Sequence, residues 1–163
     1  MAELELTRSH DDRRLYEIAG VGSVRFGRLF SRRATAEAGG ATWSFGRHGV
    51  LRPVIEAIDA NGATAGSFAP RTLRRGGALR WGDRDFELRP ASRWTERYAL
   101  ADRDRELAVL DARGWGKRPV RVTVEEPGLV EPGLLLFAAF AVRQLAEDAS
   151  ATAGGAAAAA ASG

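Results

Sequence analysis

One apolar segment near the C-terminus constrains the fold more than any other part of the sequence. Residues 131–147 read EPGLLLFAAFAVRQLAE, and no charged or polar side chain occurs between Leu134 and Val142. A helix built from these residues is apolar on every face, and such a helix has to be enclosed by other parts of the protein. Pro132 suits the first turn, where its missing N–H costs nothing, and Glu131 suits the positive end of the helix dipole. We therefore predict a buried helix over 131–147, around which the rest of the chain is arranged.

A membrane span and an interfacial anchoring helix are the alternatives for this segment. A helix that crosses a bilayer needs about 20 apolar residues. The run from Leu129 to Val142 has 14 positions and contains Glu131. The length of the run favours a core helix, with an interfacial helix as the second choice and a span as the last.

Short segments in which apolar and polar residues alternate fill the chain before this helix. Val120, Val122 and Val124 give the clearest strand, and Asn61-Gly62 between two apolar runs is a strong hairpin signal. We predict strands at 3–7, 15–19, 24–30, 33–38, 42–47, 54–58, 64–68, 79–81, 86–88, 94–101, 107–110 and 120–124.

The central part of the chain repeats itself after 43 residues without a gap. Shifted by this amount, Trp43 aligns with Phe86, Phe45 with Leu88, Ile55 with Tyr98, Ala57 with Leu100, Asn61 with Asp104, Ala65 with Ala108, Leu79 with Val122 and Trp81 with Val124. The unit contains about four short strands, and short strands about ten residues apart favour an all-β barrel or sandwich. Three such units predict a mainly β fold, a barrel of about twelve antiparallel strands that encloses the one C-terminal hydrophobic helix.

Length and composition indicate a single globular domain. The chain has 163 residues, 45% of them apolar, which is enough for a sizeable core. We expect the domain at 1–148 and a disordered tail rich in alanine and glycine at 149–163, because six alanines flanked by glycines cannot nucleate a stable helix in water. Cysteine is absent, which excludes disulfides, thiolate zinc sites and cysteine nucleophiles. The opening MAELELTRSH lacks an apolar leader, so a cytoplasmic location is expected.

A meander of β-strands in repeating units, ended by Pro127-Gly128 and followed by a wholly apolar helix, resembles the tubby C-terminal-like superfold. This group includes the tubby domain, the LURP-one-related proteins of plants and the phospholipid scramblases. The matching features are the repeat from Trp43 to Val124 and the helix EPGLLLFAAFAVRQLAE, and the pattern ALRWGDRDFELRP…RWTERYALADRDRELAVL is similar to small bacterial members of the LURP-one group. The resemblance covers most of residues 3–148 and implies a twelve-stranded barrel around a central helix.

The activities in this superfold differ from member to member. Tubby domains bind phosphoinositides, and scramblases are linked to lipid movement and calcium. The phosphoinositide motif of tubby and the calcium segment of scramblases have no match in this chain, and the scramblase palmitoylation cysteines are missing. The resemblance therefore assigns no functional residue here.

Arginines gather in two regions of the sequence, the first of which is a predicted loop. The first cluster comprises Arg71, Arg74 and Arg75, with Arg80 and Arg84 close behind, and the second comprises Arg25, Arg28, Arg32 and Arg33. Guanidinium groups match phosphate oxygens in geometry and charge. The first cluster is therefore the predicted phosphate or anionic-lipid site, and a solvated loop in an arginine-rich sequence is the alternative. The net charge of +3 permits an anionic partner without requiring one.

Other candidate constellations favour ordinary structural roles. Asp102, Asp104 and Glu106, like Asp83, Asp85 and Glu87, have the spacing of oxygen ligands, but arginines interleave with the first set and the later glutamate of a calcium loop is absent. His10 and His48 lie too far apart in sequence to suggest a metal cage or a catalytic triad. Trp43, Trp81, Trp94 and Trp115 fit core or rim packing better than a platform for stacking bases. We predict no metal, no cofactor, no catalytic residues and no nucleic-acid partner.

Three functions are compatible with these features. We expect a non-catalytic binding or scaffold domain that is recruited to anionic phospholipid or phosphorylated ligands through arginine-rich loops, peripherally at a membrane where lipid is the ligand. A structural domain for protein–protein interaction is the second choice. A lipid-handling, scramblase-like protein or an enzyme with a ligand inside the barrel is the third, because the apolar helix is expected to fill the barrel.

Overall fold

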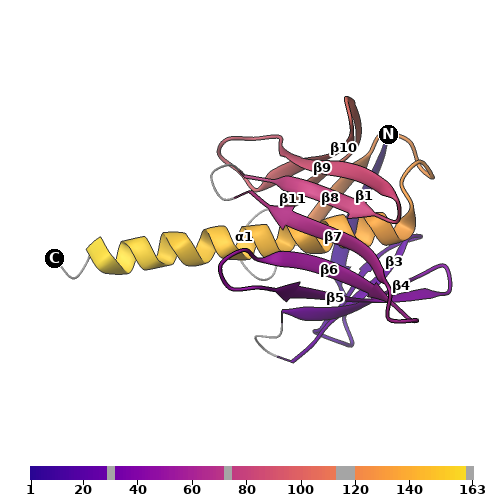
Figure 1. Ribbon diagram of the computed structural model, residues 1–163, viewed down its shortest axis with the longest axis horizontal. Helices are drawn as coiled ribbons and strands as arrows, with labels where there is room; N and C mark the ends of the chain where they lie inside the picture. The colour runs from indigo at the N-terminus through magenta and orange to yellow at the C-terminus, as the bar shows by residue number, and fades with distance from the viewer. Residues whose placement is uncertain (29–31, 72–74, 113–119, 161–163) are drawn as a thin grey trace.

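The computed structural model describes residues 1–28, 32–71, 75–112 and 120–160, the last eight of these by their backbone alone. The described residues form twelve strands and one helix (Figure 1). The strands are β1 (Ala2–Arg8), β2 (Leu15–Ile18), β3 (Gly22–Phe26), β4 (Arg33–Ala38), β5 (Ala41–His48), β6 (Val54–Asp59), β7 (Thr64–Pro70), β8 (Gly77–Trp81), β9 (Arg84–Pro90), β10 (Arg97–Asp102), β11 (Arg105–Ala112) and β12 (Val120–Val124), and the helix is α1 (Pro132–Ala160).

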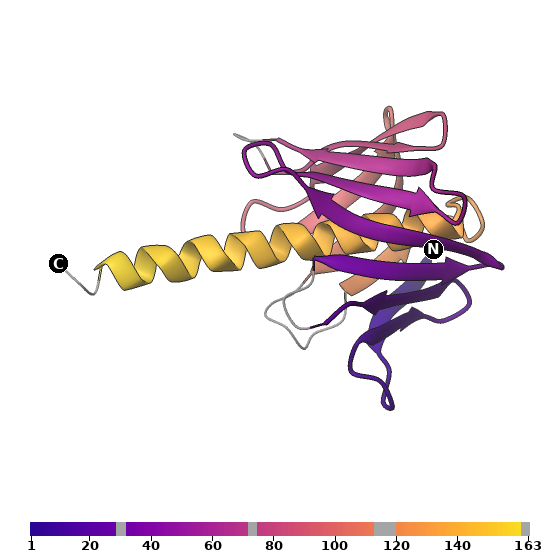
Figure 2. The same ribbon diagram turned by 60° about the horizontal axis from the view of Figure 1, so that its bottom comes forward.

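The strands form a closed antiparallel barrel in which each strand pairs with its neighbours in the sequence. β1 closes the barrel by pairing with β2 on one side and β12 on the other, so that Leu6 lies opposite both Ile18 and Val120. α1 runs along the inside of this barrel (Figure 2). The predicted fold, a mainly β barrel of twelve antiparallel strands with one C-terminal helix, is confirmed.

All twelve predicted strands occur. Most of their ends lie within two residues of the predicted ones, and two strands, β3 and β10, differ by more. β3 ends at Phe26 rather than at residue 30, because the N–H of Gly27 already donates to the carbonyl of Arg33 in a turn; residues 29 and 30 lie outside the described residues. β10 begins at Arg97 rather than at Trp94, because the N–H groups of Trp94 and Thr95 donate to the hydroxyl of Ser92 and hold this segment in a turn. Trp94 therefore lies in a connection and not in a strand.

The internal repeat is visible in the irregularities of the barrel. The pairing of β6 with β7 shifts register between Ala57 and Ile58, and the pairing of β10 with β11 shifts between Leu100 and Ala101. These two positions are equivalent under the 43-residue shift of the sequence. The repeat thus extends from side-chain pattern to the local geometry of the strands.

The centre of the core is α1, as predicted. Every residue from Leu134 to Val142 is at most 3% exposed. The ring of Phe137 lies 5.2 Å from that of Phe45 and 5.6 Å from that of Trp81, measured between centroids. At roughly 1.5–3 kcal/mol for each buried large side chain, the segment contributes on the order of 15 kcal/mol of gross stabilisation.

Small residues on the inner face of the barrel make room for the helix. α1 packs against β3, β4 and β11, and the inward positions of β4 are alanines, namely Ala34, Ala36 and Ala38. A Cβ atom added at Gly22 would lie 3.0 Å from the side chain of Leu136. The same Cβ atom would lie 2.3 Å from the backbone oxygen of Glu37, so a side chain at Gly22 would displace the neighbouring strand as well as α1.

The end of α1 differs from the expected one. We predicted a helix over 131–147 and a disordered tail over 149–163, whereas the backbone is helical to Ala160 and residues 161–163 lie outside the described residues. In an isolated peptide of this sequence, forming the first helical turn would be the costly step. Here the buried part of α1 has already formed that nucleus, and alanines propagate a helix well.

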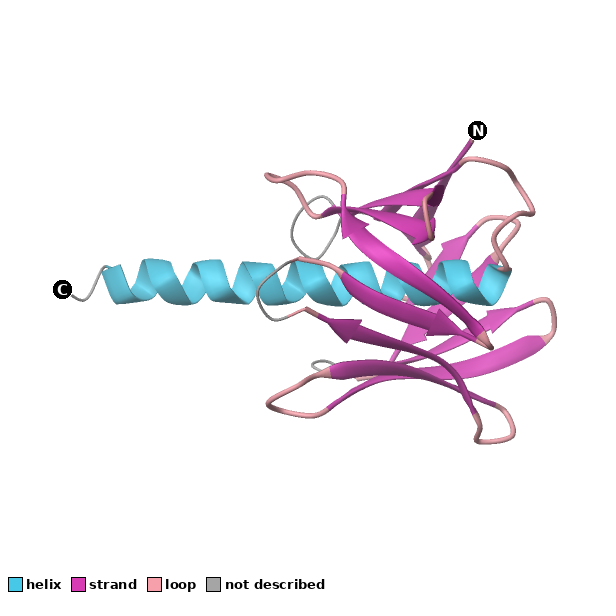
Figure 3. Ribbon diagram, turned by 45° about the horizontal axis from the view of Figure 1, so that its top comes forward, coloured by secondary structure: helices cyan, strands magenta, loops and turns pink. Residues whose placement is uncertain are grey.

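The barrel has two distinct ends (Figure 3). Because antiparallel neighbours alternate in direction, every second connection falls at the same end. The exit end, where α1 leaves the barrel, carries the connections 9–14, 49–53 and 91–96 and the described residues of the connections 27–32 and 71–76. The opposite end carries the connections 19–21, 39–40, 60–63, 82–83, 103–104 and 125–131.

Candidate functional site

A large cleft lies at the exit end, between α1 and the first two connections of that end. Its volume is about 1070 Å³, and the charged residues that line it are Arg13, Arg14, Arg28, Arg32, Arg143 and Glu147. The connection 9–14 provides two of these arginines, the connection 27–32 provides two more, and α1 provides Arg143. The cleft therefore brings together five guanidinium groups and one carboxylate from three separate segments of the chain.

Arg143 is held in place by aromatic rings and by its own helix. Its guanidinium carbon lies 4.4 Å from the ring centroids of both Tyr16 and Phe26. Its Nε donates to Glu147 one turn later, at 3.2 Å. Cation–π contacts with two rings fix the planar group while leaving its edge available for an anion.

Three other arginines of the cleft have no such partners. Arg13, Arg28 and Arg32 are exposed and form no ion pair or side-chain hydrogen bond within the described part of the chain. Unpaired guanidinium groups that share one cleft repel each other, and an oxyanion placed between them would relieve that repulsion. The cleft is thus the part of the described surface best suited to a phosphate group.

The second arginine cluster of the sequence is divided between this cleft and its neighbour. Arg28 and Arg32 line the cleft, whereas Arg25 forms an ion pair with Asp12. The backbone N–H of Arg14 and the charge of Arg25 hold the pKa of the Asp12 carboxyl below its ordinary value. Arg25 and Arg33 line a smaller adjacent cleft of about 520 Å³, which also contains His48 and Glu56 at 3.7 Å from each other.

The first cluster, which we predicted as the site, is not gathered at one place. Arg71 and Arg75 lie at the exit end, Arg80 and Arg84 lie beside the hairpin at the opposite end, and Arg74 lies outside the described residues. Acidic partners are present for all four described members: Glu87 for Arg71, Glu96 for Arg75, Asp85 at 3.9 Å for Arg80, and Asp102 at 2.6 Å for Arg84. Hydrogen bonds from Arg89 and Arg71 lower the pKa of Glu87, so this carboxylate stays charged and keeps its partners.

Arg75 supports the connection 91–96. Its guanidinium donates to the carbonyls of Ser92 at 3.2 Å and Thr95 at 2.8 Å, and it forms an ion pair with Glu96. Tyr98 donates its hydroxyl to the same carboxylate at 2.7 Å, and burial together with Glu96 raises the pKa of Tyr98 to about 12. This network fixes the backbone on which Arg93 and Trp94 are displayed.

A second contact fixes α1 where it leaves the barrel. Arg47 of β5 forms an ion pair with Asp148 of α1, with distances of 2.8 and 2.6 Å from its Nη1 to the two carboxylate oxygens. The side chain of Arg47 is only 13% exposed. The direction in which the helix emerges is therefore set by a specific, partly buried contact.

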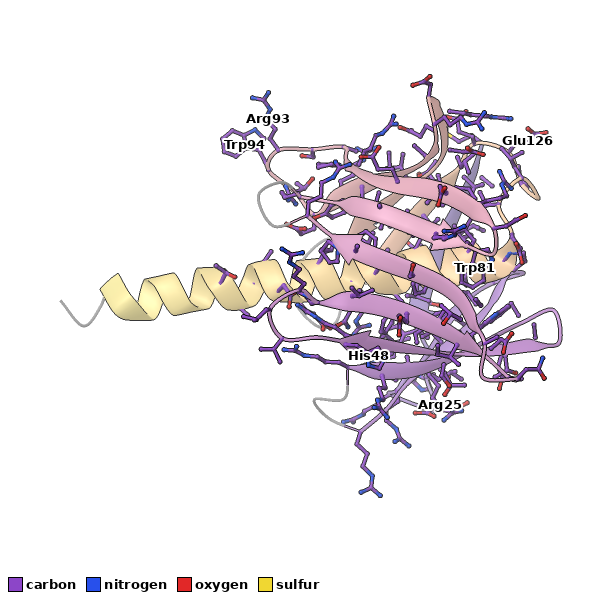
Figure 4. All side chains as sticks on the ribbon, viewed as in Figure 1. Arg25, His48, Trp81, Arg93, Trp94 and Glu126 are labelled. Atoms are coloured by element: carbon purple, nitrogen blue, oxygen red, sulfur yellow. The ribbon has the colours of Figure 1, made fainter. Side chains whose placement is uncertain are left out.

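Charge is distributed unevenly between the two ends of the barrel. The described residues of the exit-end connections include eight arginines, namely Arg13, Arg14, Arg28, Arg32, Arg52, Arg71, Arg75 and Arg93, and three carboxylates, namely Asp11, Asp12 and Glu96. The connections of the opposite end contain one arginine, Arg103, and five carboxylates, namely Asp83, Asp104, Glu125, Glu126 and Glu131. Figure 4 shows Arg93 and Trp94 at the end from which α1 emerges and Glu126 at the other.

The remaining sequence candidates lie apart from the cleft. Trp43 and Trp81 pack together with ring centroids 5.6 Å apart, Trp94 is 93% exposed, and Trp115 lies outside the described residues. Asp102 forms an ion pair with Arg84, and His10 is exposed in the connection 9–14. Within the described residues, no group of three or more histidines and carboxylates is placed to hold a metal ion.

Sequence reasoning missed three residues of the cleft, Arg13, Arg14 and Arg143. The signal was available for the first two, because strict alternation of hairpins puts the connections 9–14 and 27–32 at the same end of a barrel. Arg143 could not be placed in this way, since its position depends on how far α1 extends through the barrel before it leaves.

Comparison with known proteins gave no match to a protein-family model, a curated protein or a solved structure. Among the described residues, no helix has the length and apolar character that crossing a membrane requires.

Proposed function

We propose that this protein is a non-catalytic binding domain that docks on anionic phospholipid through its exit end. The observation that carries the proposal is the cleft in which Arg13, Arg28 and Arg32 lie beside Arg143 and form no ion pair with any described residue. Phosphate groups of lipid headgroups supply the oxygens that such a cluster lacks. An anionic bilayer also attracts basic surface residues, at about 1 kcal/mol for each arginine near the surface.

The polarity of the whole barrel supports the same surface. The arginine-rich exit end would be drawn toward an anionic membrane, and the carboxylates of the opposite end would be repelled by it. The resemblance to a superfold whose tubby members bind phosphoinositides adds support for the ligand class, although the arginines of this cleft come from no family motif.

The interior of the barrel takes no part in the proposal. Leu134 to Val142 fill it with side chains at most 3% exposed. A lipid carried inside the barrel would have to displace α1, which is the centre of the core. The proposed contact is therefore with the surface of a membrane and not with a lipid extracted from it.

Co-sedimentation with vesicles tests the proposal. We expect the protein to bind phosphatidylcholine vesicles that contain phosphatidylserine or a phosphoinositide, to bind less as salt rises, and to ignore pure phosphatidylcholine. The triple variant Arg13→Gln, Arg28→Gln, Arg32→Gln should lower the partition coefficient on the order of 100-fold, because three arginines contribute about 1 kcal/mol each.

A matched variant separates the cleft from net charge. Arg80→Gln, Arg105→Gln, Arg121→Gln removes the same charge from arginines whose side chains are more than 60% exposed and which lie away from the cleft. Equal losses in the two triple variants would contradict a role for the cleft. A third outcome would identify a phosphorylated soluble ligand instead. In it, the protein does not bind phosphatidylserine vesicles, and a soluble inositol phosphate inhibits its binding to phosphoinositide vesicles.

A further inference from the structure

The exit end also exposes large apolar side chains. Of the described residues, the large hydrophobic ones with the greatest exposure are Met1 at the chain terminus, Val50, Leu51 and Trp94. The last three are 92–97% exposed and all belong to exit-end connections. Arg52 and Arg93 directly adjoin them in the sequence. Apolar side chains bordered by arginines occur where a protein contacts the boundary between lipid headgroups and acyl chains.

Both connections that carry these side chains are held in shape. Gly49 has a positive φ of 84°, and a Cβ atom there would lie 2.6 Å from the carbonyl oxygen of Arg52. This tight turn places Val50 and Leu51 at its tip. The connection that carries Trp94 is fixed by Ser92 and by Arg75, as described above. The apolar groups are therefore displayed at fixed positions before any partner arrives.

The apolar tips and the arginine cleft are spread around one rim. In barrel order the cleft lies between the connections 9–14 and 27–32, the tip 49–53 follows, and the connection 91–96 comes after one further connection. Three points spread around a rim define a plane, and the normal of that plane lies near the barrel axis. A membrane that contacts all three meets the barrel end-on, and it also receives the part of α1 that projects beyond the rim (Figure 1).

We infer that the protein docks end-on, with the barrel axis near the membrane normal and with Val50, Leu51 and Trp94 inserted among the lipids. This inference rests on the proposed function and adds the orientation and the apolar contact. The partner is an anionic phospholipid bilayer, because the described part of the rim that carries the apolar tips also contains eight arginines, whose charge complements lipid phosphates.

The course of α1 is compatible with this orientation. The helix leaves the barrel through the same rim, and the sequence from 149 to 160 contains no charged residue. Twelve helical residues extend about 18 Å, less than the hydrocarbon thickness of about 30 Å. In the end-on orientation, residues 149–160 therefore point toward the bilayer. This segment has no charged side chain that would have to lose its hydration, and it is too short to cross the hydrocarbon layer.

Tryptophan fluorescence reports insertion independently of binding. The full chain is mixed with phosphatidylcholine vesicles that contain about one third phosphatidylserine, with and without bromine on the acyl chains. We expect the emission of Trp94 to shift to shorter wavelength and to be quenched by the brominated lipid. Trp94→Phe identifies this signal, because Trp43, Trp81 and Trp115 remain in both proteins and the difference between the two spectra comes from Trp94.

Neutral substitutions test the tip without altering electrostatics. Val50→Ser, Leu51→Ser should lower the partition coefficient about tenfold or more, since two exposed apolar side chains lose their contact with lipid. Ala60→Ser, at an exposed site of the opposite end, should leave it unchanged.

Each outcome decides a separate question. In one outcome, binding is sensitive to salt while Trp94 is not quenched and Val50→Ser, Leu51→Ser has the partition coefficient of the original protein. This result overturns end-on insertion and leaves docking on anionic lipid in place. Absence of vesicle binding overturns both. A blue shift of Trp94 that depends on protein concentration alone and disappears in the tip variant identifies self-association, and it also overturns insertion.

Discussion

Gly133 lies in the first turn of α1, where any side chain would collide with two tryptophan rings. A Cβ atom there would be 2.5 Å from Trp81 and 2.8 Å from Trp43. Alanine improves helix propensity by about 1 kcal/mol, but overpacking a core site costs typically 1–3 kcal/mol. We expect Gly133→Ala to destabilise the protein by up to about 2 kcal/mol net, measured as a lower midpoint of urea unfolding.

The same substitution farther along the helix is the control for this prediction. Gly154→Ala changes the same residue type in the part of α1 beyond the barrel and should not lower the midpoint. A Gly133→Ala protein as stable as the original would mean that the two indole rings are not packed against the first turn.

Tyr98 makes the stability of the protein depend on alkaline pH. Burial and the neighbouring Glu96 raise its pKa from 10.0 to about 12, so the folded state favours the neutral phenol. The unfolded chain ionises first as pH rises through 10, and this group's contribution to stability is therefore complete below pH 10 and lost between pH 10 and 12. We expect a loss on the order of 2 kcal/mol across this window, seen in urea unfolding at a series of pH values.

Tyr98→Phe separates this effect from general alkaline unfolding. The variant loses the hydrogen bond to Glu96 and is less stable at neutral pH, but its stability should fall less steeply between pH 10 and 12. An unchanged slope would show that the Tyr98 hydroxyl is not shielded from water as described.

Individual elements followed from the sequence where their signal was local. Alternation found all twelve strands, and the apolar run from Leu134 to Val142 found the buried helix. The failures occurred at element ends. Trp94 looked like the start of a strand, but a side-chain hydroxyl turned the backbone there. The tail looked unable to form a helix, but a preceding helix supplied the nucleus.

The extension of α1 makes a prediction at the element scale. Gly154 and Gly155 weaken a helix by about 1 kcal/mol each relative to alanine. Gly154→Ala, Gly155→Ala should therefore raise the helical circular dichroism signal at 25 °C and slow amide exchange in residues 149–160. Thermal unfolding of the barrel should change little. A tail that is disordered in solution would instead exchange at the unprotected rate in both proteins.

At the scale of the whole molecule, the site depended on information that local sequence does not contain. The first arginine cluster looked free because most of its acidic partners are distant in sequence. Glu87 lies 16 residues from Arg71, and Asp102 lies 18 residues from Arg84. The cleft exists only because barrel closure and the exit of α1 bring Arg13, Arg28 and Arg143 together. Composition showed the excess of arginine, and topology decided which arginines are left without partners.

The uneven charge of the barrel gives an electrostatic test of end-on docking. A seven-residue strand is about 23 Å long, and the usual tilt of barrel strands leaves roughly 16–19 Å of this along the barrel axis. Carboxylates at the opposite end therefore lie beyond one Debye length, about 10 Å at 0.1 M salt, from a membrane at the exit end. We expect Glu125→Gln, Glu126→Gln to change vesicle partitioning by less than about twofold at 0.1 M salt and to increase it several-fold at 0.01 M, where the Debye length is about 30 Å.

The arginine variant of the cleft provides the contrast to this result. Arg13, Arg28 and Arg32 would be in contact with the membrane, so their replacement should weaken binding at both salt concentrations. A protein lying on its side would keep Glu125 and Glu126 close to the lipid phosphates. Their neutralisation would then strengthen binding clearly even at 0.1 M salt, because unfavourable charges within one Debye length of the membrane would have been removed. At 0.1 M salt, the change in partitioning caused by the arginine variant is therefore compared with the change caused by Glu125→Gln, Glu126→Gln. Their ratio shows which part of the barrel touches the membrane.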